Sequence, residues 1–104
     1  MYHQMTYLYD RIDEELEDAE EYIEHALKYK ESAPEMASLL VKLSADELGH
    51  ASMLSNLAEQ ELTLKRKNGA APDAAFMQIH DWLKCKFADR MASIRRMHDA
   101  VAGK

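Results

Sequence analysis

Helix-breaking residues are scarce in this chain, and their positions divide it into three segments. Of the 104 residues only two are proline, Pro34 and Pro72, and three are glycine. Proline is tolerated in the first turn of a helix and not in its interior. Since apolar residues between these breaks recur at three- and four-residue spacing, we predict helices at about residues 5–31, 34–67 and 73–101, with no strand.

The two predicted joints carry helix-cap signals. Ser32, with Glu35 three residues later, predicts a capping box at the start of the second helix. At the second joint Asn68-Gly69 follows three basic residues and predicts a left-handed helix end, after which Pro72-Asp73 opens the third helix. The chain is therefore expected to form one all-α domain over residues 1–104, an antiparallel helical hairpin plus a third helix.

Charge and composition argue against several classes of protein. The net charge is −6, but residues 1–61 hold 15 acidic against 4 basic side chains and residues 62–104 hold 4 against 9. An acidic majority argues against nucleic acid as the main partner, and the basic third is expected to pack against the acidic part. No run of 18 apolar residues predicts a membrane span, and the start of the chain does not resemble a signal peptide. Together with a single cysteine, Cys85, these features predict a cytoplasmic protein without an intramolecular disulfide.

Three side chains that could bind a metal fall on predicted inward faces. Projected at 100° per residue, Glu15 lies within the apolar stripe of the first helix, and Glu47 lies near the centre of the second stripe with His50 one turn later. The predicted stripes are Leu8, Ile12, Ala19, Tyr22, Ile23 and Ala26; Met36, Leu40, Leu43, Ala51, Leu54 and Ala58; and Phe76, Ile79, Leu83, Phe87, Met91, Ile94, Met97 and Val101. Because a hairpin turning near residue 31 puts positions 15 and 47 at one height, we expect the two carboxylates to meet.

Two buried carboxylates without partners would each cost on the order of several kcal/mol. No Lys or Arg lies centrally on either face, so we predict a divalent cation held by Glu15, Glu47 and His50. Glu-x-x-His is a weak pattern by itself, and a partly exposed polar strip stays open as the alternative.

The stretches EELEDAEEYIEHA and PEMASLLVKLSADELGHASM resemble the ferritin-like di-iron carboxylate proteins, in particular rubrerythrin-type and encapsulated-ferritin half-bundles. The resemblance covers about residues 8–60. It implies that Glu47 bridges two irons and that Glu15 and His50 bind one each. It also implies that Tyr22 lies close by as a hydrogen-bond partner or electron donor. The chain carries one copy of a ligand set that a complete bundle has twice, so a homodimer or larger homo-oligomer would complete the four-helix site.

On this basis we expect an iron protein with ferroxidase activity, oxidising Fe(II) with O₂ at a dimer interface. Manganese or zinc in place of iron, and a helical scaffold or interaction protein without redox chemistry, stay open as alternatives. The paired cysteines of a rubrerythrin electron-transfer module are absent from the sequence. The sequence does not identify a redox partner, an encapsulating shell or a storage cage.

Other residues of the third segment are expected to have structural roles. His80 and His98 are five helical turns apart, about 27 Å, and cannot share one ion, so each is expected at the edge of the core or at an interface. Arg90 could pair with Glu61 or another acid, and Trp82 and Cys85 are expected to project outward.

Overall fold

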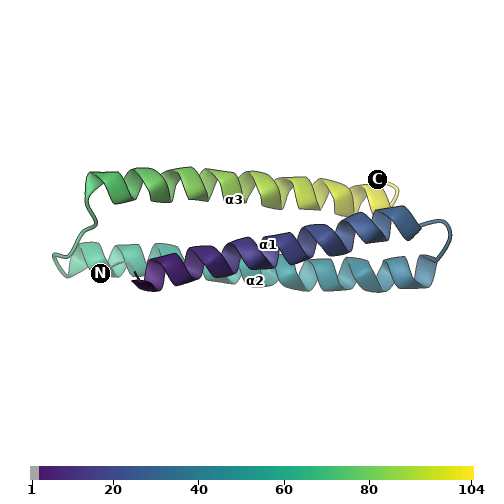
Figure 1. Ribbon diagram of the computed structural model, residues 1–104, viewed down its shortest axis with the longest axis horizontal. Coiled ribbons are helices and arrows are strands. Elements are labelled where there is room, and N and C mark those ends of the chain that lie inside the picture. The colour runs from purple at the N-terminus through teal and green to yellow at the C-terminus, as the bar shows by residue number, and fades with distance from the viewer. Residues whose placement is uncertain (1–2) are drawn as a thin grey trace.

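The computed structural model describes residues 3–104 as three long helices, each antiparallel to the one before it along the chain, so that the first and the third run in the same direction (Figure 1). They are α1 (His3–Tyr29), α2 (Pro34–Lys67) and α3 (Ala74–Val101), and no strand occurs in this part of the chain. The molecule is a rod of 56 × 17 × 17 Å. The predicted all-α class and helical hairpin are confirmed, and the predicted helix bounds are correct to within two residues.

The first joint differs from the prediction. The residue in the N-cap position of α2 is Ala33, whose side chain makes no cap hydrogen bond, so the capping box predicted for Ser32 and Glu35 is wrong. Pro34 occupies the first turn, where it has no N–H to be capped and where its restricted φ suits the helix. The helix therefore begins one residue later than a Ser32 cap would require.

The second joint follows the predicted chemistry. Gly69 has a φ of 72°, and the N–H groups of Gly69 and Ala70 donate to the carbonyls of Arg66 and Lys65 at 3.3 and 2.8 Å. This pair of hydrogen bonds is a Schellman motif. The motif requires a residue in the left-handed conformation, which glycine adopts without a Cβ clash. The α3 helix then begins at the Asp73 cap, whose Oδ1 accepts from the Phe76 N–H at 2.8 Å.

The core lies along α1, which contacts both other helices, whereas α2 and α3 meet at few positions. Four of the five buried residues of α2 are small and recur every seven positions, and the fifth is Leu62. The buried apolar and polar residues of α1 oppose them. The α2 set is Ala37, Ser44, Ala51, Ala58 and Leu62, and the α1 set is Met5, Leu8, Ile12, Glu15, Leu16, Ala19, Ile23 and Ala26. Small side chains let two helix backbones approach closely, which explains why this row forms the contact.

This packing corrects the predicted stripes on α2 and α3. Met36 and Ile79 were expected to face inward, but they are 42% and 57% exposed. The projection followed the largest apolar side chains, whereas close helix packing selected the row of small ones. A second row of α2, also spaced by seven, consequently lies at the surface or half-buried: Met36, Leu43, His50, Leu57 and Leu64.

The α3 helix contacts the hairpin through polar side chains as well as through its apolar face. Arg90 pairs with Glu20 and Asp13 at 2.7 and 2.6 Å, so its partner is not the Glu61 considered from the sequence. His98 Nε2 lies 2.9 Å from the buried Ser44 hydroxyl. Trp82 and Cys85 project outward as predicted. None of the helices in residues 3–104 is long and apolar enough to cross a membrane.

Candidate metal centre

Glu15, Glu47 and His50 meet near the middle of the α1–α2 hairpin. Each offers one ligand atom, and these three atoms lie within 4.8 Å of one another, so the group could hold a metal ion. His50 Nδ1 lies 3.4 Å from Glu15 Oε2 and 3.9 Å from Glu47 Oε1. The expectation that positions 15 and 47 stand at the same height in the hairpin is confirmed.

Local packing holds the two helices close at this height. Ser44 and Ala51, on either side of Glu47 along α2, are fully buried. The Ser44 hydroxyl donates to the carbonyl of Ala19, one turn after Glu15, at 2.7 Å. Because these contacts lie within about one turn of the acids, the carboxylates are brought together by the fold of the hairpin rather than by their own attraction.

The three side chains differ in their exposure to solvent. The Glu15 side chain is 9% exposed, that of Glu47 23%, and that of His50 55%. The prediction that His50 faces inward is therefore wrong for an isolated chain, because His50 belongs to the surface row of α2. Glu15 and His50 border a shallow groove between α1 and α2, which is lined by Arg11, Glu15, His50, Met53, Leu54 and Leu57.

Arg11 is a basic partner that the sequence projection missed. Its Nη2 donates to Glu15 Oε1 at 2.6 Å, and its Nη1 contacts Glu14. Arg11 lies off the apolar stripe, but a long side chain four residues before Glu15 can reach it along the helix surface. The four-residue spacing of the opposite charges was the signal that could have predicted this pair.

The second oxygen of Glu15 has no such partner. Glu15 Oε2 is buried and accepts no hydrogen bond from the residues that the structure describes. Leaving a buried carboxylate oxygen without a donor is costly, and native proteins normally satisfy such an atom with a proton, a water or an ion. The orphaned oxygen faces His50, on the side of Glu15 where a cation would be shared.

The two acids also influence each other's pKa. The neighbouring Glu15, together with burial, raises the pKa of Glu47 from its ordinary value of 4.5 to about 7. The pKa of Glu15 is lowered, first by its interaction with Glu47 and then by His50 and Arg11, against an opposing effect of burial. Two close carboxylates avoid like charges by keeping one proton between them, and a proton on Glu47 could supply the donor that Glu15 Oε2 lacks.

Tyr22, the fourth predicted site residue, is half-buried two turns further along α1. Seven residues correspond to about 10 Å along a helix axis. The predicted role of Tyr22 as hydrogen-bond partner or electron donor stays a prediction.

Comparison with known protein families, curated proteins and solved structures found no match. The resemblance to ferritin-like di-iron proteins therefore stays a prediction from the quoted motifs. The case for a metal centre depends on the geometry of Glu15, Glu47 and His50 in this chain.

Proposed function

We propose that two copies of the chain bind two iron ions between their α1–α2 hairpins and oxidise Fe(II) with O₂. The observation that carries this proposal is the meeting of Glu15, Glu47 and His50 around an orphaned carboxylate oxygen. The ferroxidase step itself is taken from the motif resemblance.

The donor set fits iron. Carboxylate oxygens and an imidazole nitrogen suit hard and borderline divalent ions, whereas soft metals prefer the sulfur ligands that this group lacks. A cation between the two acids would take the place of their shared proton and satisfy Glu15 Oε2. By the motif resemblance, Glu47 would be the bridge, and Glu15 and His50 would each bind one ion.

Residues 3–104 of one chain supply three ligand residues to this group, on an open surface. Two copies facing each other would supply four carboxylates and two imidazoles, the complement of a four-helix carboxylate bundle. The surface around the group suits such a contact, because the exposed apolar residues Met53 and Leu57 line the same groove as Glu15 and His50. Covering this surface with a second hairpin would also bury His50, the most exposed of the proposed ligands.

Fe(II) is the substrate of the proposed reaction. Two ferrous ions each lose one electron, and O₂ takes up the two electrons and two protons, so 2 Fe²⁺ + O₂ + 2 H⁺ gives 2 Fe³⁺ + H₂O₂. Glu15 and Glu47 favour this direction, since anionic oxygen ligands stabilise the more highly charged ferric ion. Manganese or zinc would fit the same donor set without this reaction.

A scaffold or interaction protein without redox chemistry is the second candidate. The Arg11–Glu15 ion pair favours it, because this pair neutralises one of the two acids without a metal. The exposure of His50 is also compatible with a polar surface strip.

Oxygen consumption after addition of Fe(II) separates these candidates. The wild-type protein should consume about one O₂ per two Fe(II), following the stoichiometry above, and Glu47→Gln should abolish this activity. Glu17→Gln, which removes one exposed acid from α1, is the matched control and should leave the rate unchanged. Equal rates in wild type and Glu47→Gln would refute the proposal.

A further inference from the structure

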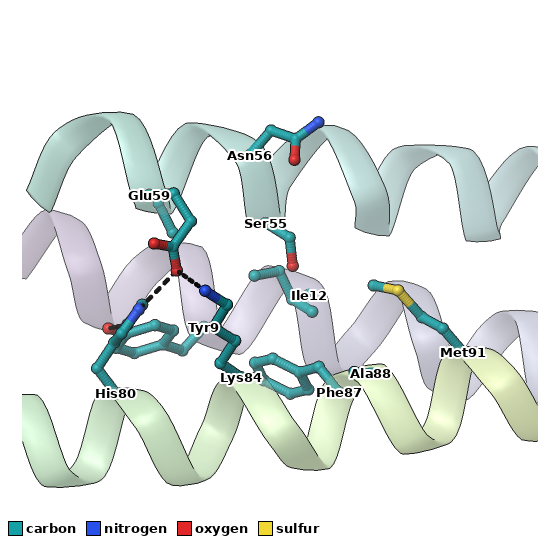
Figure 2. Close-up of a pocket in the computed structure, with 11 residues that line it drawn as sticks. Tyr9, Ile12, Ser55, Asn56, Glu59, His80, Lys84, Phe87, Ala88 and Met91 are labelled. Carbon is teal, nitrogen blue, oxygen red and sulfur yellow. Dashed lines mark hydrogen bonds and ion pairs between the residues drawn. The ribbon is translucent and has the colours of Figure 1, made fainter. Parts of the chain in front are cut away.

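A second polar cluster joins all three helices toward the open end of the hairpin, where α1 begins and α2 ends. The Tyr9 hydroxyl of α1 lies 2.6 Å from His80 Nδ1 of α3, and His80 Nε2 lies 2.7 Å from Glu59 Oε1 of α2. Figure 2 shows these side chains side by side, with Lys84 approaching the same carboxylate oxygen at 3.7 Å. His80 was expected at the edge of the core, and its contacts with Tyr9 and Glu59 were not predicted from the sequence.

The direction of the hydrogen bonds follows from the chemistry of the three groups. An ionised Glu59 can only accept, so His80 Nε2–H donates to it. In the tautomer that carries its one proton on Nε2, Nδ1 accepts from the Tyr9 hydroxyl, and this is the arrangement on which the inference below rests. His80 is only 4% exposed, so its ring is held in place to receive the phenolic proton.

Simple ionisation of Tyr9 is disfavoured at this position. Burial, followed by the negative charges of Glu59 and Asp81, raises the pKa of Tyr9 to about 12. A nucleophilic or basic phenolate is therefore excluded near neutral pH. Loss of an electron together with the proton leaves a neutral phenoxyl group, so no negative charge has to be buried on Tyr9. The proton then resides on an imidazolium that faces the carboxylate of Glu59.

We propose that Tyr9 is a one-electron donor whose phenolic proton passes to His80 Nδ1 as the electron leaves. The oxidant is hydrogen peroxide at the iron site, and this part of the inference rests on the proposed function. In a dimer two Tyr9 side chains would reduce one peroxide, 2 Tyr–OH + H₂O₂ giving 2 Tyr–O• + 2 H₂O. The O–O bond breaks, each tyrosine loses one electron and one O–H bond, and the protons taken up by His80 are balanced by protons that enter from water.

The position of Tyr9 suits this role. It lies six residues before Glu15 on the same helix, about 9 Å along the axis. A cavity of about 200 Å³ borders Tyr9, His80 and Glu59 and offers room for water that accepts the proton from His80 (Figure 2). Neither Tyr7, which is 63% exposed, nor Tyr22 has a histidine base at its hydroxyl among residues 3–104.

A photogenerated ruthenium(III) polypyridyl oxidant tests the chemistry of Tyr9 without iron. Electron paramagnetic resonance should detect a tyrosyl radical in the wild-type protein and in Tyr7→Phe, the exposed matched control, but not in Tyr9→Phe. His80→Gln keeps an acceptor for the hydroxyl but removes the base, so Tyr9 oxidation should slow by about a hundredfold. Circular dichroism checks that each variant remains folded.

A solvent isotope effect provides a readout that needs no variant. Oxidation of the wild-type tyrosine should be slower in D₂O, because the transferred proton belongs to the hydroxyl. A radical that persists in Tyr9→Phe, or an oxidation rate that His80→Gln and D₂O leave unchanged, would overturn the inference and leave the cluster as a structural tie between helices.

A second experiment replaces the ruthenium oxidant with Fe(II) and O₂. The same Tyr9 radical is expected, lost in Tyr9→Phe and retained in Tyr7→Phe. A Tyr9 radical with ruthenium, without iron-dependent oxygen consumption, would support Tyr9 as a donor and refute the proposed function. Iron-dependent oxygen consumption with a radical on another residue would overturn the Tyr9 inference and leave the proposed function standing.

Discussion

Replacing Arg11 tests whether Glu15 binds a cation. In the structure Arg11 Nη2 lies 2.6 Å from Glu15 Oε1. The positive charge of Arg11 is therefore paired with one oxygen of the carboxylate whose other oxygen, Oε2, would bind the metal. A metal–oxygen bond of about 2.2 Å would place a divalent ion about 5 Å from the guanidinium. We therefore expect Arg11→Gln to strengthen metal binding, although it removes an ion pair from the protein.

The size of this effect follows from Coulomb repulsion. The Arg11 side chain is 39% exposed, so a water-like dielectric constant of about 80 is appropriate. Charges of +1 and +2 at about 5 Å then repel by about 1.7 kcal/mol, which corresponds to roughly fifteenfold tighter binding in the variant. The lost ion pair should lower the stability of the metal-free protein by less than about 1 kcal/mol.

Isothermal titration calorimetry with Mn(II) measures the metal affinity of each variant. Oxygen does not oxidise Mn(II) under these conditions, so binding is measured without the redox reaction. Arg96→Gln removes an equal charge from the exposed surface of α3 and is the matched control. An affinity of Arg11→Gln equal to or weaker than that of the control would show that the cation does not bind beside Glu15, and would favour the scaffold alternative.

The packing and the pKa shifts lead to four further predictions. Because its pKa is raised to about 7, Glu47 must lose a proton before it can bind a metal. Metal affinity should therefore weaken as the pH falls through 7, and metal binding near pH 6 should release a proton that a pH-indicator titration can measure. In the metal-free protein the raised pKa of Glu47 stabilises the fold below about pH 4.5, and this stabilisation is lost as the pH rises through 7. A urea midpoint that does not change between these two pH values would contradict this prediction. Leu57→Asp should leave the helical content intact but shift the sedimentation coefficient to that of a monomer, and an unchanged oligomer would place the contact elsewhere. Ser44→Leu should lower the free energy of unfolding by about 1–3 kcal/mol relative to the exposed Ser38→Leu, because Ser44 is fully buried between α1 and His98.

The fold was largely predictable because its breaks are local. Pro34, Gly69 and Pro72 act through backbone geometry that each residue carries in any context, so the helix bounds followed from the sequence. The same regularity made the meeting of Glu15 and Glu47 predictable, since rise per residue is fixed once the turn is placed.

The remaining features depend on tertiary packing and on long side chains. The row of Ala37, Ser44 and Ala51 forms the helix contact because small residues allow close approach, and hydropathy ranks such residues below leucine or methionine. Arg11 reaches Glu15 from outside the stripe, which a projection of Cβ directions cannot represent. The contact between Tyr9, on α1, and His80, on α3, depends on the tertiary packing of α3 against the hairpin.

The exposure of His50 has a different origin. Its row on α2 is exposed or half-buried in residues 3–104, so sequence periodicity identified an apolar surface without identifying what covers it. In the proposed assembly that cover is the α1–α2 hairpin of a second copy.

Native mass spectrometry after anaerobic addition of Fe(II) tests this central claim most directly, since it reports subunit number and bound iron in one spectrum. We predict a dimer carrying two irons, with Glu47→Gln forming a dimer without bound iron. A folded wild-type protein that binds no iron, or a monomer that binds it as tightly as any dimer, would contradict the shared metal centre.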